Sequence, residues 1–308
     1  MIFSNFFNLA FLKFPIYLPI LYGLILYSFP DYESALVFFT LLLLAEPHFG
    51  ATWPFFLTKE NRPEIINNKL EYIFIPIMIV VGSFFAYFLI NYYFLIIFFA
   101  ANVYHVTKQS FGVSKLFLKK GEEIKFHEIV IYSYGLIFFI IGIVRFYLNL
   151  IPEGQIIVLN LIIIFSIILI LLFYIYYFGF SQNVLSLLTG IIIFYPICFV
   201  SSPIHGIIMG VTMHYVQYLS LTYKIQLKRE EEKSTKFSYF NINYITIVAV
   251  YGIIMSILSL NNTDQSEIFR YLIILPIIGQ LLHFYIDSLL WKFSSKHNRD
   301  VTLKFIKT

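Results

Sequence analysis

The sequence predicts an all-α integral membrane protein, a bundle of about ten transmembrane helices in one domain that covers residues 1–308. Hydrophobic residues make up 59% of the chain and charged residues only 12%, whereas charged side chains occupy about 25% of positions in a soluble domain. A soluble fold of this size needs a polar exterior, and this chain has too few polar residues to cover one. No loop exceeds about 20 residues, which leaves no room for a separate soluble domain.

The apolar runs have the length of membrane-spanning helices. Each is about 16 to 24 residues long, close to the roughly 20 residues that a helix needs to cross a hydrocarbon core of about 30 Å. Prolines within several runs agree with this interpretation, because transmembrane helices tolerate kinks where neighbours satisfy the freed carbonyl groups. In chain order, the predicted spans cover residues 14–29, 34–57, 71–90, 92–114, 127–148, 156–178, 183–200, 204–223, 240–260 and 268–291.

Basic side chains predict the orientation of these spans. Of the 21 Lys and Arg residues, all but Arg145 and Arg270 fall in segments on the same side of the predicted spans, and the opposite loops are neutral or acidic. Because cytoplasmic loops collect Lys and Arg, both termini are expected in the cytoplasm. The short loops and the lack of targeting features indicate a bacterial inner membrane.

Composition also excludes several classes of function. Cys198 is the one cysteine, so the chain can form neither an internal disulfide nor a cysteine metal site. The basic residues lie in short loops where they report topology, and nucleic acid is not an expected partner. The sequence shows no Gly-rich phosphate loop, nucleophile elbow or internal repeat.

Four of the seven histidines lie inside predicted spans, where an ionisable side chain is costly and usually functional. Each is followed after nine to eleven residues by the lysine that ends its span, which puts all four roughly 14–17 Å from the cytoplasmic boundary. Four imidazoles at one depth can converge on one metal ion, and imidazole suits iron, copper or zinc. The predicted metal ligands are His48, His105, His214 and His283.

Two other interpretations of these four histidines stay open. Each ring can instead hold two helices together through its own hydrogen bond, or a pair at one depth can provide the axial ligands of a haem. The remaining histidines, His127, His205 and His297, fall in cytoplasmic or interfacial segments and are expected to be solvated or interfacial.

Asp287 and Tyr218 are the candidate catalytic residues. Asp287 follows His283 by four positions, so both side chains share a helix face, where the carboxylate can orient the imidazole or bind the metal. The alternative is a carboxylate near the interface that pairs with Lys292. Four aromatic side chains are expected to line a cavity for an apolar substrate, the alternative being ordinary packing. They are Tyr104, Tyr215, Tyr218 and Phe284.

The four histidine segments read EPHFG at 46–50, YHVTKQSFG at 104–112, HYVQY at 214–218 and LHFYID at 282–287. In these segments the chain resembles the bacterial Brp/Blh-type membrane β-carotene cleaving dioxygenases. It departs from the pattern of that family where Thr52 replaces an Asp, where Tyr218 replaces a second His, and where Asp287 comes one residue early. The resemblance implies a non-haem iron held by histidines and cleavage of a carotenoid to retinal.

The sequence therefore predicts a membrane-embedded, iron-dependent oxygenase of the dioxygenase type. Fe(II), with copper and haem as alternatives, would activate O₂ beside a lipid or isoprenoid substrate that enters from the bilayer. The second hypothesis is an acyl-chain hydroxylase or desaturase, although such enzymes place more histidine clusters in cytoplasmic segments. The third is a protein without enzymatic activity, either a transporter or a haem-bearing membrane protein.

Overall fold

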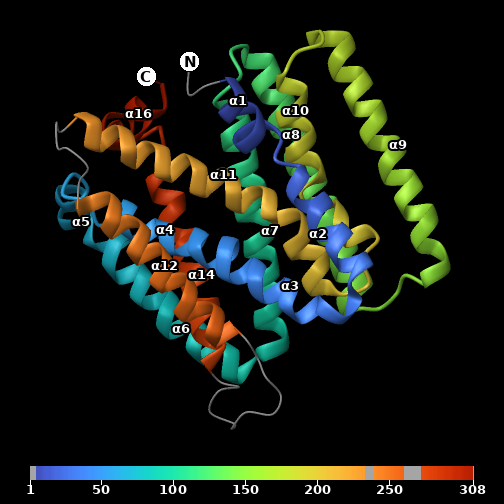
Figure 1. Cartoon of the computed structure of the whole chain (residues 1–308), viewed down its shortest axis with the longest axis horizontal. Helices are drawn as coiled ribbons and strands as arrows, with labels where there is room; N and C mark the ends of the chain where they lie inside the picture. The colour runs from blue at the N-terminus through green and yellow to red at the C-terminus, as the bar shows by residue number, and fades with distance from the viewer. Residues whose placement is uncertain (1–4, 233–238, 260–271, 308) are drawn as a thin grey trace. The chain divides into compact units, whose positions relative to one another are not determined.

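The computed structural model of the chain describes residues 5–232, 239–259 and 272–307, and every regular element within these ranges is helical (Figure 1). The predicted all-α class is therefore confirmed for the described residues. Parts of the last two predicted spans, residue 260 and residues 268–271, lie outside the described residues. The same holds for Lys233, Lys236 and Arg270 of the predicted loops.

Several helices have the composition of membrane-spanning segments. Among the described residues, four helical runs are long and apolar enough to cross a membrane: Pro30–Phe56, Leu70–Leu89, Gly121–Tyr147 and Gly154–Phe178. Their length and composition indicate a membrane protein. Shorter apolar helices cover Tyr17–Ser28, Asn183–Ile192, Tyr244–Ser259 and Ile274–Leu290.

A helix lies in each predicted span, but some of these helices are short. The helix α10 (Asn183–Ile192) is about 15 Å long, half the thickness of a hydrocarbon core. It ends before Pro196, which has no backbone N–H to continue it, and the 3₁₀ turn η6 (Tyr195–Cys198) follows. The count of about ten crossings and the cytoplasmic location of both termini stay predictions.

The chain divides into two compact units. Among the described residues, the first, called the α4 unit, contains Phe38–Ala101 and Tyr218 onwards, and the second, called the α8 unit, contains Asn5–Val37 and Asn102–Gln217. Three continuous helices contribute residues to both units: α3 (Glu33–Thr40), α7 (Asn91–Lys115) and α11 (Pro203–Glu232).

In the α4 unit, α4 packs against α12 and α14, and α14 also packs against α6 (Figure 1). Two glycines allow α4 and α12 to approach closely. A Cβ at Gly50 would lie 2.9 Å from the Tyr251 ring, and a Cβ at Gly252 would lie 2.9 Å from Pro47. The elements of this unit are η3 (Leu41–Ala45), α4 (Glu46–Phe56), α5 (Arg62–Asn67), η4 (Leu70–Phe74), α6 (Ile75–Leu89), α12 (Tyr239–Ser259), α14 (Ile274–Leu290), α15 (Lys296–Asn298), η7 (Arg299–Leu303) and α16 (Lys304–Lys307).

In the α8 unit, α8 lies beside α10 (Figure 1). Gly190 allows this contact, because a Cβ there would lie 2.7 Å from Ile131. Tyr22, Val200 and Met209 form a further buried cluster, which joins α2 to α11. Besides α10 and η6, the elements of this unit are α1 (Asn5–Phe7), η1 (Asn8–Lys13), α2 (Tyr17–Ser28), η2 (Pro30–Tyr32), α8 (Gly121–Gly142), η5 (Ile143–Tyr147) and α9 (Glu153–Phe178).

The C-terminal segment of the α4 unit is held by one buried cation, Arg229 at the end of α11. Its guanidinium donates to the Val301 carbonyl at 2.8 Å and to Thr302 Oγ1 at 3.3 Å. The same group lies 4.5 Å from the Phe55 ring centroid and 5.7 Å from that of Phe305. Burial lowers the pKa of Arg229 to about 10, so the side chain stays charged at neutral pH.

Replacing Arg229 by Met is expected to release η7 and α16 from the unit. The change removes a desolvated cation–π contact and leaves a carbonyl without its donor, at a cost of about 2–4 kcal/mol together. Limited trypsin digestion of the purified protein should then cut at Arg299 and Lys304 much faster than in the wild type. Lys59→Met, which removes the same charge from an exposed position, is the control, and equal cleavage in both variants would contradict this role.

Candidate metal centre

The helix α4 carries two side chains of the candidate centre on one face. The π-helical turn η3 ends directly before α4, and Pro47 occupies the first turn of α4. Such π-helical turns within longer helices are often found at functional sites. His48 and Thr52 are four positions apart, so their side chains point the same way, and both are fully buried.

Thr52 forms the centre of a buried hydrogen-bonded cluster in the α4 unit. Its Oγ1 lies 2.6 Å from Nδ1 of His283, 2.8 Å from the Tyr218 hydroxyl and 3.2 Å from Oδ1 of Asp287. The Tyr218 hydroxyl also donates to Oδ1 of Asp287 at 2.7 Å. His283 and Asp287 are one turn apart on α14, as predicted, and Asp287 points into this cluster rather than outwards to the interface.

The proton on each of these groups follows from their chemistry. An ionised carboxylate only accepts hydrogen bonds, and the Tyr218 proton goes to Asp287, so Thr52 gives its single hydroxyl proton either to Asp287 or to the Tyr218 oxygen. Thr52 must then accept from His283, and Nδ1 is the protonated ring nitrogen. This assignment leaves the lone pair of the neutral His283 ring on Nε2.

The two inward atoms of this cluster fit a bound cation. Nε2 of His283 lies 3.7 Å from Oδ2 of Asp287, and an imidazole nitrogen and a carboxylate oxygen are both common metal ligands. Bonds from a divalent metal to nitrogen or oxygen are about 2.0–2.2 Å long, so one ion can contact both atoms. Thr52 then holds the far side of the imidazole, which fixes its tautomer and orientation.

His48 adds a second imidazole to this set. Its ring centroid lies 4.5 Å from that of His283 and 4.4 Å from that of Tyr218. Two imidazoles and one carboxylate are the ligand set of many non-haem Fe(II) oxygenases. Phe49 packs edge-on against His283 with ring centroids 5.1 Å apart, which keeps water away from the cluster.

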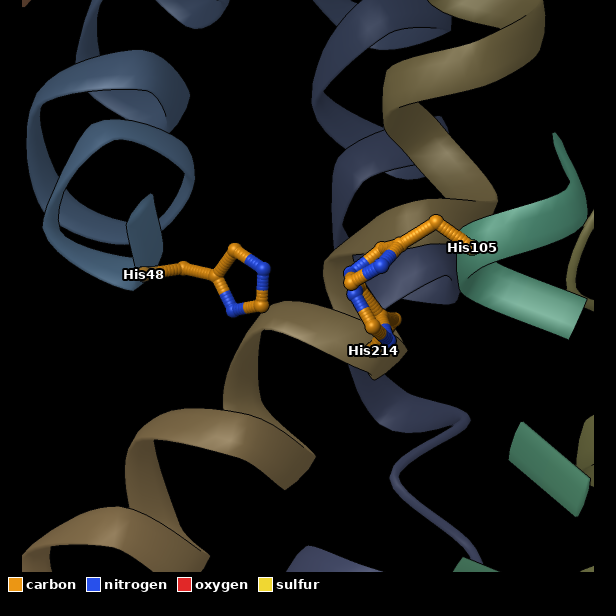
Figure 2. A group of neighbouring side chains, drawn as sticks. All are labelled: His48, His105 and His214. Atoms are coloured by element: carbon orange, nitrogen blue, oxygen red, sulfur yellow. The ribbon is translucent and has the colours of Figure 1, made fainter. Parts of the chain in front are cut away.

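The other two predicted ligands form a pair within the α8 unit. His105 comes from α7 and His214 from α11, and their ring centroids lie 5.4 Å apart in an edge-to-face arrangement. Both side chains are buried. Figure 2 shows these two rings side by side; the third labelled ring is His48 of α4, which belongs to the other unit.

The remaining three histidines lie outside the candidate centre. His127 and His205 are both buried rather than solvated, and an interfacial location for them stays a prediction. His127 lies 2.6 Å from Ser114 Oγ, because α8 begins at Gly121 and carries the ring into the interior of its unit. His205 lies between the Tyr22 hydroxyl and the Glu33 carboxylate, 2.6 Å from each. His297 is partly buried, with Nε2 2.9 Å from Oδ1 of Asn61.

The four aromatic residues that were predicted to line a cavity lie in different surroundings. Tyr218 lies within the cluster, and Phe284 packs against His283 and Phe98. Tyr215 is buried, whereas Tyr104 is 57% exposed and walls no interior space. Sequence reasoning missed Thr52 as a site residue, although its position four residues after His48 is a signal that could have found it.

Comparison with known protein families, with curated proteins and with solved structures finds no match to this chain. The fold and the candidate centre together define an all-helical chain with apolar, membrane-length helices and buried histidine clusters that can hold a metal.

Replacing Thr52 by Val is expected to weaken both the fold and the metal site. Val keeps the shape of the side chain but leaves the His283 and Asp287 groups without their partner, which costs about 1–3 kcal/mol. Loss of a group that orients a ligand weakens metal binding by about 10–100-fold. Iron titration and thermal unfolding measure the two effects. Thr52→Ser keeps the hydroxyl and should behave as the wild type; Val and Ser variants with the same iron affinity would argue against an orienting hydroxyl.

Proposed function

We propose that this protein is a membrane-embedded non-haem iron oxygenase that acts on a lipid or isoprenoid substrate. His48, His105, His214 and His283 would hold one Fe(II), in a bundle that crosses the membrane about ten times with both termini in the cytoplasm. The observation that carries the proposal is the buried group of ligand-type side chains in the α4 unit, in which Nε2 of His283 lies 3.7 Å from Oδ2 of Asp287, beside the His48 ring.

The sequence supports a single site for all four histidines. Each is followed after nine to eleven residues by the lysine that ends its predicted span, so all four are expected at one depth in the membrane. Within each unit, the structure brings two of these rings together: His48 and His283 in the α4 unit, and His105 and His214 in the α8 unit.

Fe(II) fits this donor set. Imidazole and carboxylate ligands suit Fe(II), and sulfur ligands, which favour Cu(I), do not occur among the candidate residues. Bound Fe(II) would supply O₂ activation; for a polyene, cleavage of one carbon–carbon double bond places one oxygen atom in each of two carbonyl products.

The protein's own side chains have defined tasks in this proposal. Tyr218 donates to Oδ1 of Asp287 and so turns Oδ2 towards Nε2 of His283. Thr52 keeps the His283 ring in the tautomer that presents Nε2. The buried rings of Phe49 and Phe284 exclude water, which suits a substrate that never leaves the bilayer.

Oxygen incorporation tests the proposal. The protein is loaded with Fe(II) under anaerobic conditions in lipid nanodiscs, with or without β-carotene, and is then exposed to ¹⁸O₂. Mass spectrometry should find ¹⁸O in a product of the carotenoid or of the lipid, and no such product with the His283→Ala variant. No labelled product from either compound, or a haem Soret band in the purified protein, would overturn it.

A further inference from the structure

The α8 unit contains an apolar pocket that the candidate metal centre does not account for. Its volume is about 330 Å³, and it lies between α2, α9, the η6 turn and α11. The lining residues are Ile16, Pro19, Ile20, Ile164, Ile167, Ile168, Ile192, Tyr195, Pro196, Phe199, Met209, Gly210 and Met213. None of them carries a charge, so the pocket suits a hydrocarbon rather than a polar headgroup.

The outer rim of the pocket faces the bilayer. Its residues Ile20, Ile164 and Ile168 are between 41% and 54% exposed. Two of them, Ile164 and Ile168, belong to α9. Its run Gly154–Phe178 has the highest mean hydropathy of the four membrane-length runs in the described part of the chain, and little of this run is buried. A ligand that enters over this rim therefore comes from the hydrocarbon region of the membrane.

One wall of the pocket belongs to α11, the helix that carries His214. Met213, which is fully buried, directly precedes His214 in α11. Gly210 lies one turn before His214 on the same helix face. The His214 ring in turn contacts His105. The pocket thus lies between the exposed side of α9 and the stretch of α11 that carries a proposed metal ligand.

The size of the pocket selects between apolar ligands. One water molecule occupies about 30 Å³ in the liquid, so the volume of the pocket is about eleven times as large. This volume is at the small end of the range of ligand pockets. This space fits a flexible chain of on the order of ten carbon atoms. It does not enclose a carotenoid, whose rigid polyene and end rings need a longer and wider cavity.

We propose that this pocket binds one unsaturated acyl chain of a bilayer lipid, so that an acyl lipid is the substrate of the oxygenase. Cleavage of the carbon–carbon double bond would then give two carbonyl groups, each with one atom of O₂. Binding of the chain stands on the pocket alone, and its role as substrate rests on the proposed function. The ligand is recognised by shape and by the absence of polar partners, as expected for a flexible aliphatic chain among Ile, Met and Pro side chains.

Native mass spectrometry of the purified protein tests this inference. Detergent-solubilised protein is mixed with a phosphatidylglycerol of defined unsaturated sixteen-carbon chains, and the lipid retained per chain is counted. Ile167→Trp fills the pocket from a buried position, and Ile168→Trp closes its rim from an exposed one, so that the second variant remains informative if the first does not fold. Leu169→Trp, on the same helix and half exposed but outside the pocket, is the matched control.

We expect the wild type and Leu169→Trp to retain the lipid, and both pocket variants to retain it at least tenfold less. Iron content, measured in the same samples, should be unchanged in all four proteins. Equal lipid retention in every variant, or displacement of the lipid by β-carotene, would overturn the inference. Pocket-dependent lipid binding in a protein that takes up no iron would support the acyl-chain site and overturn the proposed oxygenase.

Discussion

Replacing His48 or His214 by Ala is expected to remove iron from the proposed centre. The two residues belong to different units, and each replacement removes one imidazole from the proposed centre. Because loss of even a group that only orients a ligand costs about 10–100-fold in affinity, loss of a ligand itself should cost more, and iron should fall from about one atom per chain to less than about 0.1. Elemental analysis of protein purified after iron supplementation measures this.

Two other buried histidines provide matched controls for this experiment. His127 and His205 are as buried as the proposed ligands, but their rings contact Ser114, Tyr22 and Glu33. His127→Ala and His205→Ala should keep the full complement of iron. If a variant in only one unit loses iron, the centre lies within that unit and the four-histidine site is wrong.

Replacing Gly210 by Ala is expected to prevent the α8 unit from folding. A Cβ at this position would overlap the carbonyl oxygen of Ile193, and backbone atoms cannot move aside as a flexible side chain can. Overpacking typically costs about 1–3 kcal/mol, and a clash with backbone lies at or above the upper end of this range. The yield of monodisperse protein in detergent should fall severely, and thermal unfolding of any remainder should occur at a lower temperature.

Gly112 provides the control for this substitution. It lies in α7, and a Cβ there would meet no atom within 4 Å. Gly112→Ala should be neutral or slightly stabilising, because Ala favours the helix by about 1 kcal/mol over Gly. A Gly210→Ala protein with wild-type yield and unfolding temperature would mean that α11 does not approach Ile193 as closely as described.

Composition was sufficient to predict the helical class, because few charged residues and long apolar runs leave one way to satisfy the backbone in a membrane. The start of a helix is harder to predict. The π-helical turn η3 and the early start of α8 at Gly121 follow from packing between helices, and the burial of His127 arises there. The sequence predicts one span over residues 183–200, whereas α10 ends at Ile192. The sequence does not indicate this end, because residues Phe194 to Phe199 are as apolar as the helix itself.

The candidate centre could be predicted where spacing along one helix determines it. Asp287 follows His283 by one turn, and the structure places both in the same buried cluster. Contacts between helices follow no such rule. The hydrogen bond from Thr52 to Asp287 joins residues 235 positions apart, and no single-sequence pattern indicates it. The apolar pocket also escapes prediction, because its isoleucines have the same periodicity as lipid-facing positions.

X-ray absorption at the iron edge of the purified, iron-loaded wild type tests the four-histidine centre most directly. We expect Fe(II) with nitrogen and oxygen ligands at about 2.1 Å, and outer-shell scattering that fits at least three imidazole rings. Because the α4 unit contributes only His48 and His283 to the candidate centre, a third ring requires His105 or His214 of the α8 unit. Two rings or fewer, a porphyrin signature, or no bound iron would contradict the shared centre.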